Sequence, residues 1–139
     1  MAERKRSWGM APSFLRLALA ILMLFGGIDK FSRYNVTVNG MVATFKDTWL
    51  PGVMVRAFAY ALPFIECSLG GLLLIGLFIP VAAFFLSLLL LALIFGSVLL
   101  GKTDQLQFQF VVLIVTQFVM LLGPTDKFSL DDKRGATVA

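Results

Sequence analysis

The distribution of apolar residues along the 139-residue chain predicts four membrane-spanning helices. Long apolar runs cover residues 13–31, 53–78, 81–100 and 106–123, and short polar stretches separate them. A helix needs about 20 residues to cross the hydrocarbon core of a bilayer, and each run has roughly that length or more. The pattern therefore predicts a single all-α domain, an integral membrane four-helix bundle.

The stretch between the first two runs, residues 32–52, is too polar to cross a membrane. Four of its apolar residues recur at helical spacing: Met41, Val42, Phe45 and Trp49. This spacing is typical of a short helix that lies in the membrane interface. We expect Trp8 and Trp49 to anchor the chain at the interfaces, and Arg16 to extend its charged end to the interface near Trp8.

The connections between the last three runs are short. Residues 79–80, Ile-Pro, leave room only for a tight turn, so the second and third helices must form an antiparallel hairpin. Residues 101–105 read as a polar loop, and Gly-Pro at 123–124 ends the last helix before a polar tail, 124–139.

The composition agrees with a membrane protein. Hydrophobic residues make up 59% of the chain and charged residues 14%, whereas soluble domains average about 45–50% and about 25%. The chain has no histidine and one cysteine, Cys67, which excludes bis-His haem ligation, imidazole metal sites and a disulfide within the chain. We expect no metal site and no cofactor bound by this chain alone.

The positive charges cluster near the ends of the predicted spans, where they orient helices and meet anionic lipid, so we expect membrane lipid and not nucleic acid as a partner. An even number of spans places both termini on one side. That side carries Arg4, Lys5, Arg6, Arg16, Lys127, Lys133 and Arg134. The other side carries Lys30, Arg33, Lys46, Arg56 and Lys102. The excess on the first side predicts that both termini lie in the cytoplasm.

The second run contains one carboxylate, Glu66, near its middle. An ionisable side chain is costly inside a bilayer, so it faces other protein or a water-filled cavity and marks a functional candidate. Ala59, Pro63 and Gly70 lie along the same helical face, and these small neighbours predict that Glu66 points into the bundle. The paired glycines at residues 26–27 allow another helix to approach the first one closely.

Helical rise places further polar residues near the height of Glu66. Asp29 and Lys30 lie about one turn above it, and Gln109 lies within about one turn. These four residues are the candidates for binding a ligand or handling a proton. Lys30 could neutralise Glu66, or desolvation could keep Glu66 protonated. The cluster could fix only the helix register, or it could form a small pocket, open toward the outer leaflet, whose carboxylate binds a polar headgroup or handles a proton.

Three stretches resemble the DoxX family of small four-helix membrane proteins. Residues 16–30 have arginine, then glycine, then lysine along the first span, and residues 63–80 have a glutamate followed by glycines and a short turn. Residues 123–131 are similar to the family's Gly-Pro-Gly-x-x-Ser-Leu-Asp ending, with Thr125 in place of the second glycine. The resemblance implies a multi-pass protein of a prokaryotic inner (plasma) membrane. It also implies partnership in redox systems, because the family's namesake is the membrane subunit of a thiosulfate:quinone oxidoreductase.

Two functional hypotheses follow. The first is a non-catalytic membrane subunit that anchors the other protein subunits of a redox or electron-transfer complex and forms part of a quinone or lipid pocket. The alternative is a stand-alone DoxX-like quinone-reducing oxidoreductase, or a carrier of small molecules or lipids, that uses Glu66 and Lys30.

Overall fold

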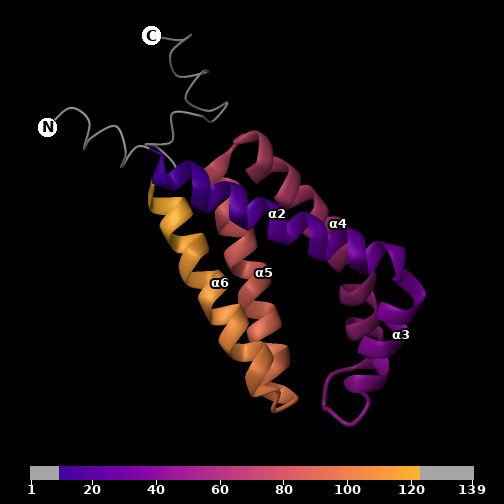
Figure 1. Ribbon diagram of the computed structural model, residues 1–139. Coiled ribbons are helices and arrows are strands. Elements are labelled where there is room, and N and C mark those ends of the chain that lie inside the picture. Colours follow the sequence, from indigo (N-terminus) through magenta and orange to yellow (C-terminus); the bar gives the residue numbers. More distant parts are fainter. Residues whose placement is uncertain (1–9, 123–139) are drawn as a thin grey trace, which may run out of the picture.

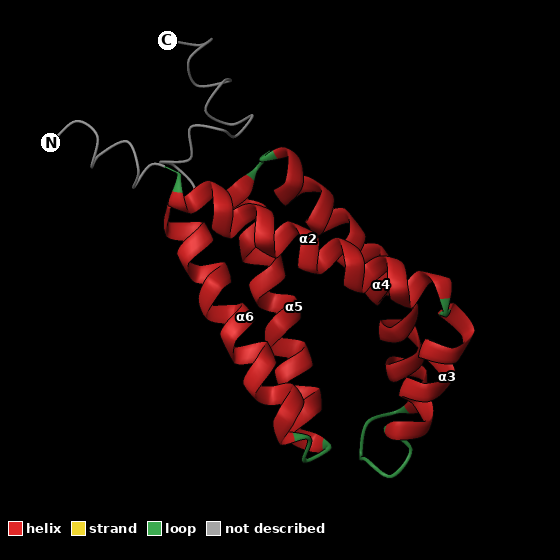
Figure 2. Cartoon of the chain, viewed as in Figure 1, coloured by secondary structure: helices red, strands yellow, loops and turns green. Residues whose placement is uncertain are grey.

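The computed structural model describes residues 10–122, and every regular element in that part of the chain is a helix (Figures 1 and 2). The helices are α2 (Ala11–Ser32), α3 (Tyr34–Thr44), α4 (Gly52–Ile75), α5 (Ile79–Leu99) and α6 (Thr103–Leu122). All but α3 are long and apolar enough to cross a membrane. The predicted all-α fold with four spans is confirmed.

The turn between the second and third spans lies earlier in the chain than predicted. Helix α4 ends at Ile75, and Gly76 follows in the left-handed conformation with φ 71°. Leu77 N–H then donates to Leu72 O at 3.0 Å, which closes the last turn of α4 in the usual glycine-capped way. Pro80 belongs to the first turn of α5, where its missing N–H has no partner to lose. The predicted turn at residues 79–80 is therefore wrong by about one helical turn.

The predicted short helix between spans one and two exists, but it begins earlier in the chain, and of the four apolar residues that predicted it α3 contains only Met41 and Val42. Helix α3 begins directly after α2, with only Arg33 between them, and ends at Thr44. Phe45 and Trp49 lie in the segment after α3. The helical spacing of the apolar residues had placed both of them in the helix. Tyr34 fixes α3 on α4, because its hydroxyl donates to Tyr60 O at 3.2 Å and the two rings lie 5.4 Å apart.

The four spans form two pairs, α2 with α4 and α5 with α6. The pairs meet at the end of the bundle where α2 begins and α6 ends, and they diverge towards α3 (Figure 1). Most of the largest fully buried side chains lie on the segments that meet at this closed end: Leu19, Leu73, Ile79, Leu86, Thr116 and Val119. The hydrophobic core therefore joins the pairs at one end and leaves room between them at the other.

The outer surface of the bundle is apolar. Phe25 is 71% exposed, and large apolar side chains on the other spans, such as Phe84, Val111 and Leu121, are also more than half exposed. Such a coat is unfavourable in water and favourable against lipid tails. Together with the four apolar helices, it makes this chain a multi-pass membrane protein. The tail 124–139 and the helix stop at residues 123–124 lie outside the described residues.

Candidate functional site

Helices α2 and α4 touch backbone to backbone where they cross. A Cβ on Gly27 would lie 2.6 Å from Cys67 Sγ and 3.2 Å from Pro63 O, which is too close for any side chain. On the other helix, a Cβ on Gly70 would lie 3.0 Å from Leu24 N. The predicted close approach at the paired glycines therefore occurs at Gly27, and α4 contributes a second glycine to it.

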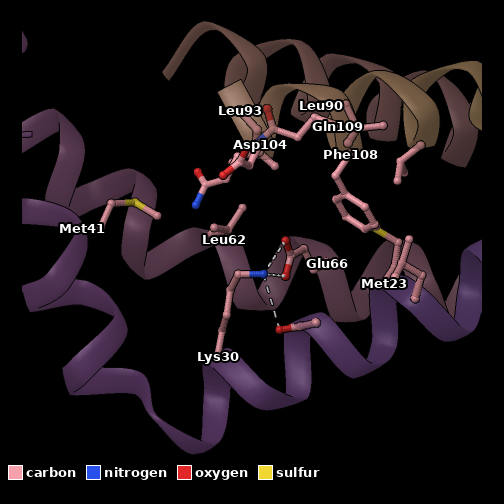
Figure 3. A pocket seen from close by; sticks show the side chains of 14 residues that line it. Met23, Lys30, Met41, Leu62, Glu66, Leu90, Leu93, Asp104, Phe108 and Gln109 are labelled. Atoms are coloured by element: carbon pink, nitrogen blue, oxygen red, sulfur yellow. Dashed lines mark hydrogen bonds and ion pairs between the residues drawn. The ribbon is translucent and has the colours of Figure 1, made fainter. Parts of the chain in front are cut away.

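This contact brings Lys30 and Glu66 together. Lys30 Nζ lies 2.7 Å from Glu66 Oε2 and 3.0 Å from Glu66 Oε1, and it lies 3.5 Å from Gly26 O (Figure 3). The Glu66 side chain is only 6% exposed, while that of Lys30 is 30% exposed. Of the two ways to accommodate Glu66, the geometry shows pairing with Lys30. Gly26 lies beside the pair, because a Cβ there would be 3.6 Å from Lys30 Nζ and 3.7 Å from Glu66 Oε2.

The ion pair faces a cavity of about 540 Å³ between the two helix pairs, which we call the site cavity. Its first wall, the ionic wall, consists of Gly26, Lys30 and Glu66 from α2 and α4. Apolar residues of all four spans form much of the remaining lining: Leu22, Met23, Leu62, Leu90, Leu93 and Val112, with Met41 from α3. The volume is in the range of small-molecule sites, about 300–1,000 Å³, and an apolar lining with a few polar groups is their usual composition.

The opposite wall of the site cavity belongs to α6. This α6 wall consists of Asp104, Gln105, Phe108 and Gln109 (Figure 3). The Ser97 hydroxyl donates to Gln109 Oε1 at 3.1 Å, so the amide nitrogen of Gln109 keeps its two N–H groups for other acceptors. Gln109 therefore lies in the same cavity as Lys30 and Glu66, as expected, but across from them.

The sequence analysis missed Asp104 and Gln105 as members of the site. It placed them in a loop, whereas α6 begins at Thr103 and includes both. Helical spacing in the sequence could have indicated their place. Asp104 lies four residues before Phe108, and Gln105 lies four residues before Gln109, so each pair shares one face of α6.

Asp29 does not join the site. Its side chain is exposed and lies 3.7 Å from the side chain of Arg33, the residue that follows α2. Adjacent helical residues point in directions about 100° apart, so Lys30 and Asp29 cannot both face α4. The expectation that Asp29 joins Glu66 fails because helical height says nothing about the direction of a side chain.

Arg16 corrects the expectation that it would extend to the membrane interface. It is 3% exposed, and its guanidinium donates to the backbone oxygens of Leu73 and Leu74, the latter at 2.9 Å. These carbonyls belong to the last turn of α4, where the helix leaves acceptors unpaired and carries partial negative charge. Arg16 is thus bound within the bundle, at the C-terminal end of α4.

The two tryptophan anchors have different outcomes. Trp49 is 74% exposed and contacts Phe95 of α5 edge-on, with ring centroids 6.4 Å apart. This position suits the predicted role at the interface, whereas Trp8 lies outside the described residues. Across residues 10–122, no three His, Cys, Asp or Glu side chains gather in a way that could hold a metal ion.

A comparison with protein-family models decides the family. The DoxX model matches residues 11–98, which is more than half of the chain. The chain belongs to the DoxX family. The DoxX match contains Arg16, Lys30 and Glu66, whereas the α6 wall lies beyond it. The stretch at 123–131 that resembles a DoxX ending lies outside both the match and the described residues. Searches of curated proteins and of solved structures gave no match.

Proposed function

We propose that this DoxX family protein is a membrane subunit of a redox complex and that its site cavity binds the head of a membrane quinone. The observation that carries the proposal is the placement of hydrogen-bond donors on both sides of the cavity. The Lys30 ammonium lies on the ionic wall, and the Gln109 amide lies on the α6 wall. A para-quinone has carbonyl acceptors on opposite sides of its ring, so a donor from each wall matches it.

Each polar residue has a separate part in binding. Lys30 uses two N–H groups on Glu66, and its third points towards Gly26 O at a distance too long for a strong bond. This third N–H is the one that turns to a ligand carbonyl. Glu66 keeps the ammonium charged and oriented, and Ser97 keeps the Gln109 amide oriented so that its nitrogen donates.

The electron carrier is assigned to a partner subunit. Reduction of a quinone takes two electrons and two protons, and this chain has no histidine for haem and only one cysteine. The redox role of the DoxX namesake, at the level of family resemblance, supports the same division of labour. Both termini in the cytoplasm of a prokaryotic inner membrane would place the site cavity in the outer half of the bilayer.

Purification in mild detergent followed by native mass spectrometry tests this proposal. We expect a complex with a stoichiometric partner and about one bound quinone per copy of this chain. The double variant Lys30→Met with Glu66→Met, which leaves no buried charge unpaired, should keep the partner and lose the quinone, while Asp29→Asn, a control outside the cavity, should keep both. Recovery of the chain alone, with lipid as the only bound molecule, would contradict the proposal and favour a lipid carrier.

A further inference from the structure

A second cavity of about 340 Å³ adjoins the site cavity, and we call it the side chamber. It lies between α5 and the part of the chain that runs from α3 into α4. The two cavities share four lining residues: Met41, Leu93, Gln105 and Gln109. The side chamber has no charged residue in its lining, which is formed mainly by apolar side chains such as Phe45, Met54, Phe58 and Phe95.

The segment after α3 closes the side chamber against α5. The Phe45 ring packs on Gly96, where an added Cβ would lie only 3.1 Å from Phe45 Cζ. Beside it, the Trp49 ring meets the Phe95 ring, and both are largely exposed on the outside of the bundle. Two aromatic contacts, Phe45 on Gly96 and Trp49 on Phe95, therefore separate the chamber from lipid.

The charges of the site cavity favour a neutral head. Lys30 and Glu66 neutralise each other at 2.7 Å, and Asp104 adds a carboxylate to the opposite wall. An anionic headgroup would meet this carboxylate and find no unpaired cation in the lining, so its desolvation would not be compensated. A neutral acceptor needs only the N–H donors.

From this arrangement we infer that the ligand is a neutral amphipath with one apolar chain, whose head occupies the site cavity and whose chain passes through the side chamber. The chain leaves into the bilayer between α5 and the Phe45–Trp49 contacts. The inference rests on the proposed quinone site and adds the route of the chain. Because the bilayer is as apolar as the chamber, the gain in affinity comes from packing of the chain against the chamber walls and not from its removal from water.

The test compares a benzoquinone that carries a decyl chain with the same ring without a chain. Both are titrated against protein in nanodiscs of phosphatidylcholine, and each affinity is expressed per mole fraction of the compound in the lipid, so that partition into the bilayer cancels. Wild-type protein should bind the decyl compound at least tenfold more tightly than the bare ring. Ala92→Phe fills the side chamber from α5 and should remove this difference while leaving the affinity for the bare ring unchanged. Ala57→Phe is the matched control, since Ala57 is exposed on α4 and lines neither cavity, and it should keep the difference.

Ala92 also borders a third cavity, of about 500 Å³, between α4 and α5, so a second variant fills the side chamber without touching that cavity. Met54→Trp fills the chamber from α4 and should likewise remove the preference for the decyl compound. If wild type binds the bare ring and the decyl compound equally, or if both filling variants keep the preference, the route is wrong and the head site stands. If wild type binds neither compound, the head site fails and the route fails with it.

Discussion

The contact between the two helices of each pair has a different chemistry in the two pairs. At the α2–α4 contact, Gly27 and Gly70 bring backbones together, and the charges of Lys30 and Glu66 are neutralised within the contact. At the α5–α6 contact, neutral hydrogen bonds join the helices: Gln117 Nε2 to Ser87 Oγ at 2.8 Å, and Ser97 Oγ to Gln109 Oε1.

The difference shows which wall of the site cavity is fixed. The ionic wall lies on helices whose backbones have no space to shift, so the position of the ammonium is set before any ligand arrives. The α6 wall is held by neutral hydrogen bonds, which are weak in membrane proteins. The contact that carries the ion pair should therefore resist change more strongly than the contact that carries the Gln109 amide.

The largest expected effect comes from breaking the ion pair on one side only. Lys30→Met or Glu66→Ala strands a buried charge, and such truncations typically cost about 3–5 kcal/mol. The double variant Lys30→Met with Glu66→Gln should lose less free energy of unfolding than the two singles, Lys30→Met and Glu66→Gln, added together. Unfolding in mixed detergent micelles measures all of these variants.

Asp29→Asn is the control for the pair, because Asp29 is exposed and lies 3.7 Å from Arg33. Its effect should stay within about 0.5 kcal/mol. Strictly additive losses in the Lys30 and Glu66 cycle would mean that the pair does not couple the two helices.

A smaller effect is expected from filling the helix contact. Gly27→Ala forces a Cβ to within 2.6 Å of Cys67 Sγ and 3.1 Å of Cys67 N, and such overpacking costs about 1–3 kcal/mol. Gly26→Ala adds a methyl group at ordinary contact distances and should be neutral or stabilising by up to about 1 kcal/mol. Thermal unfolding of the two neighbours separates packing from helix propensity, and equal losses would show that the backbones are not in contact.

The smallest effect is expected at the α5–α6 contact. Gln117→Leu removes the amide that donates to Ser87, and interhelical bonds of this kind average about 0.6 kcal/mol in membrane proteins. A double-mutant cycle with Ser87→Ala should give a coupling of that size. A coupling as large as that of Lys30 with Glu66 would remove the distinction between the two pairs.

The sequence predicts the ionic wall well because helical rise and small residues determine it. Glu66 and Lys30 lie on spans joined by one connection, at heights about one turn apart, and glycines let those spans approach. Asp29 is misplaced because height says nothing about the direction of a side chain. Asp104 and Gln105 are missed because a polar helix start has the same composition as a loop.

The turn and the partner of Arg16 depend on details that hydrophobic patterns do not contain. Gly76 ends α4 because it adopts a positive φ, although the apolar run continues to Phe78. Arg16 lies near the N-terminal end of its span, which predicts that its side chain extends to the membrane interface. The C-terminal end of α4 nevertheless lies within its reach. Both outcomes require knowing which helix ends meet.

The central claim is that Lys30 and Glu66 form a binding site and not only a structural pair. The most direct measurement is titration of the decyl quinone against the double variant Lys30→Met with Glu66→Met, with its free energy of unfolding measured in parallel. Apolar residues of similar length can replace a buried ion pair with little loss of stability, so the variant should remain folded. Our account predicts wild-type stability to within about 1.4 kcal/mol and affinity reduced at least tenfold. A folded double variant that binds the quinone with wild-type affinity would contradict it.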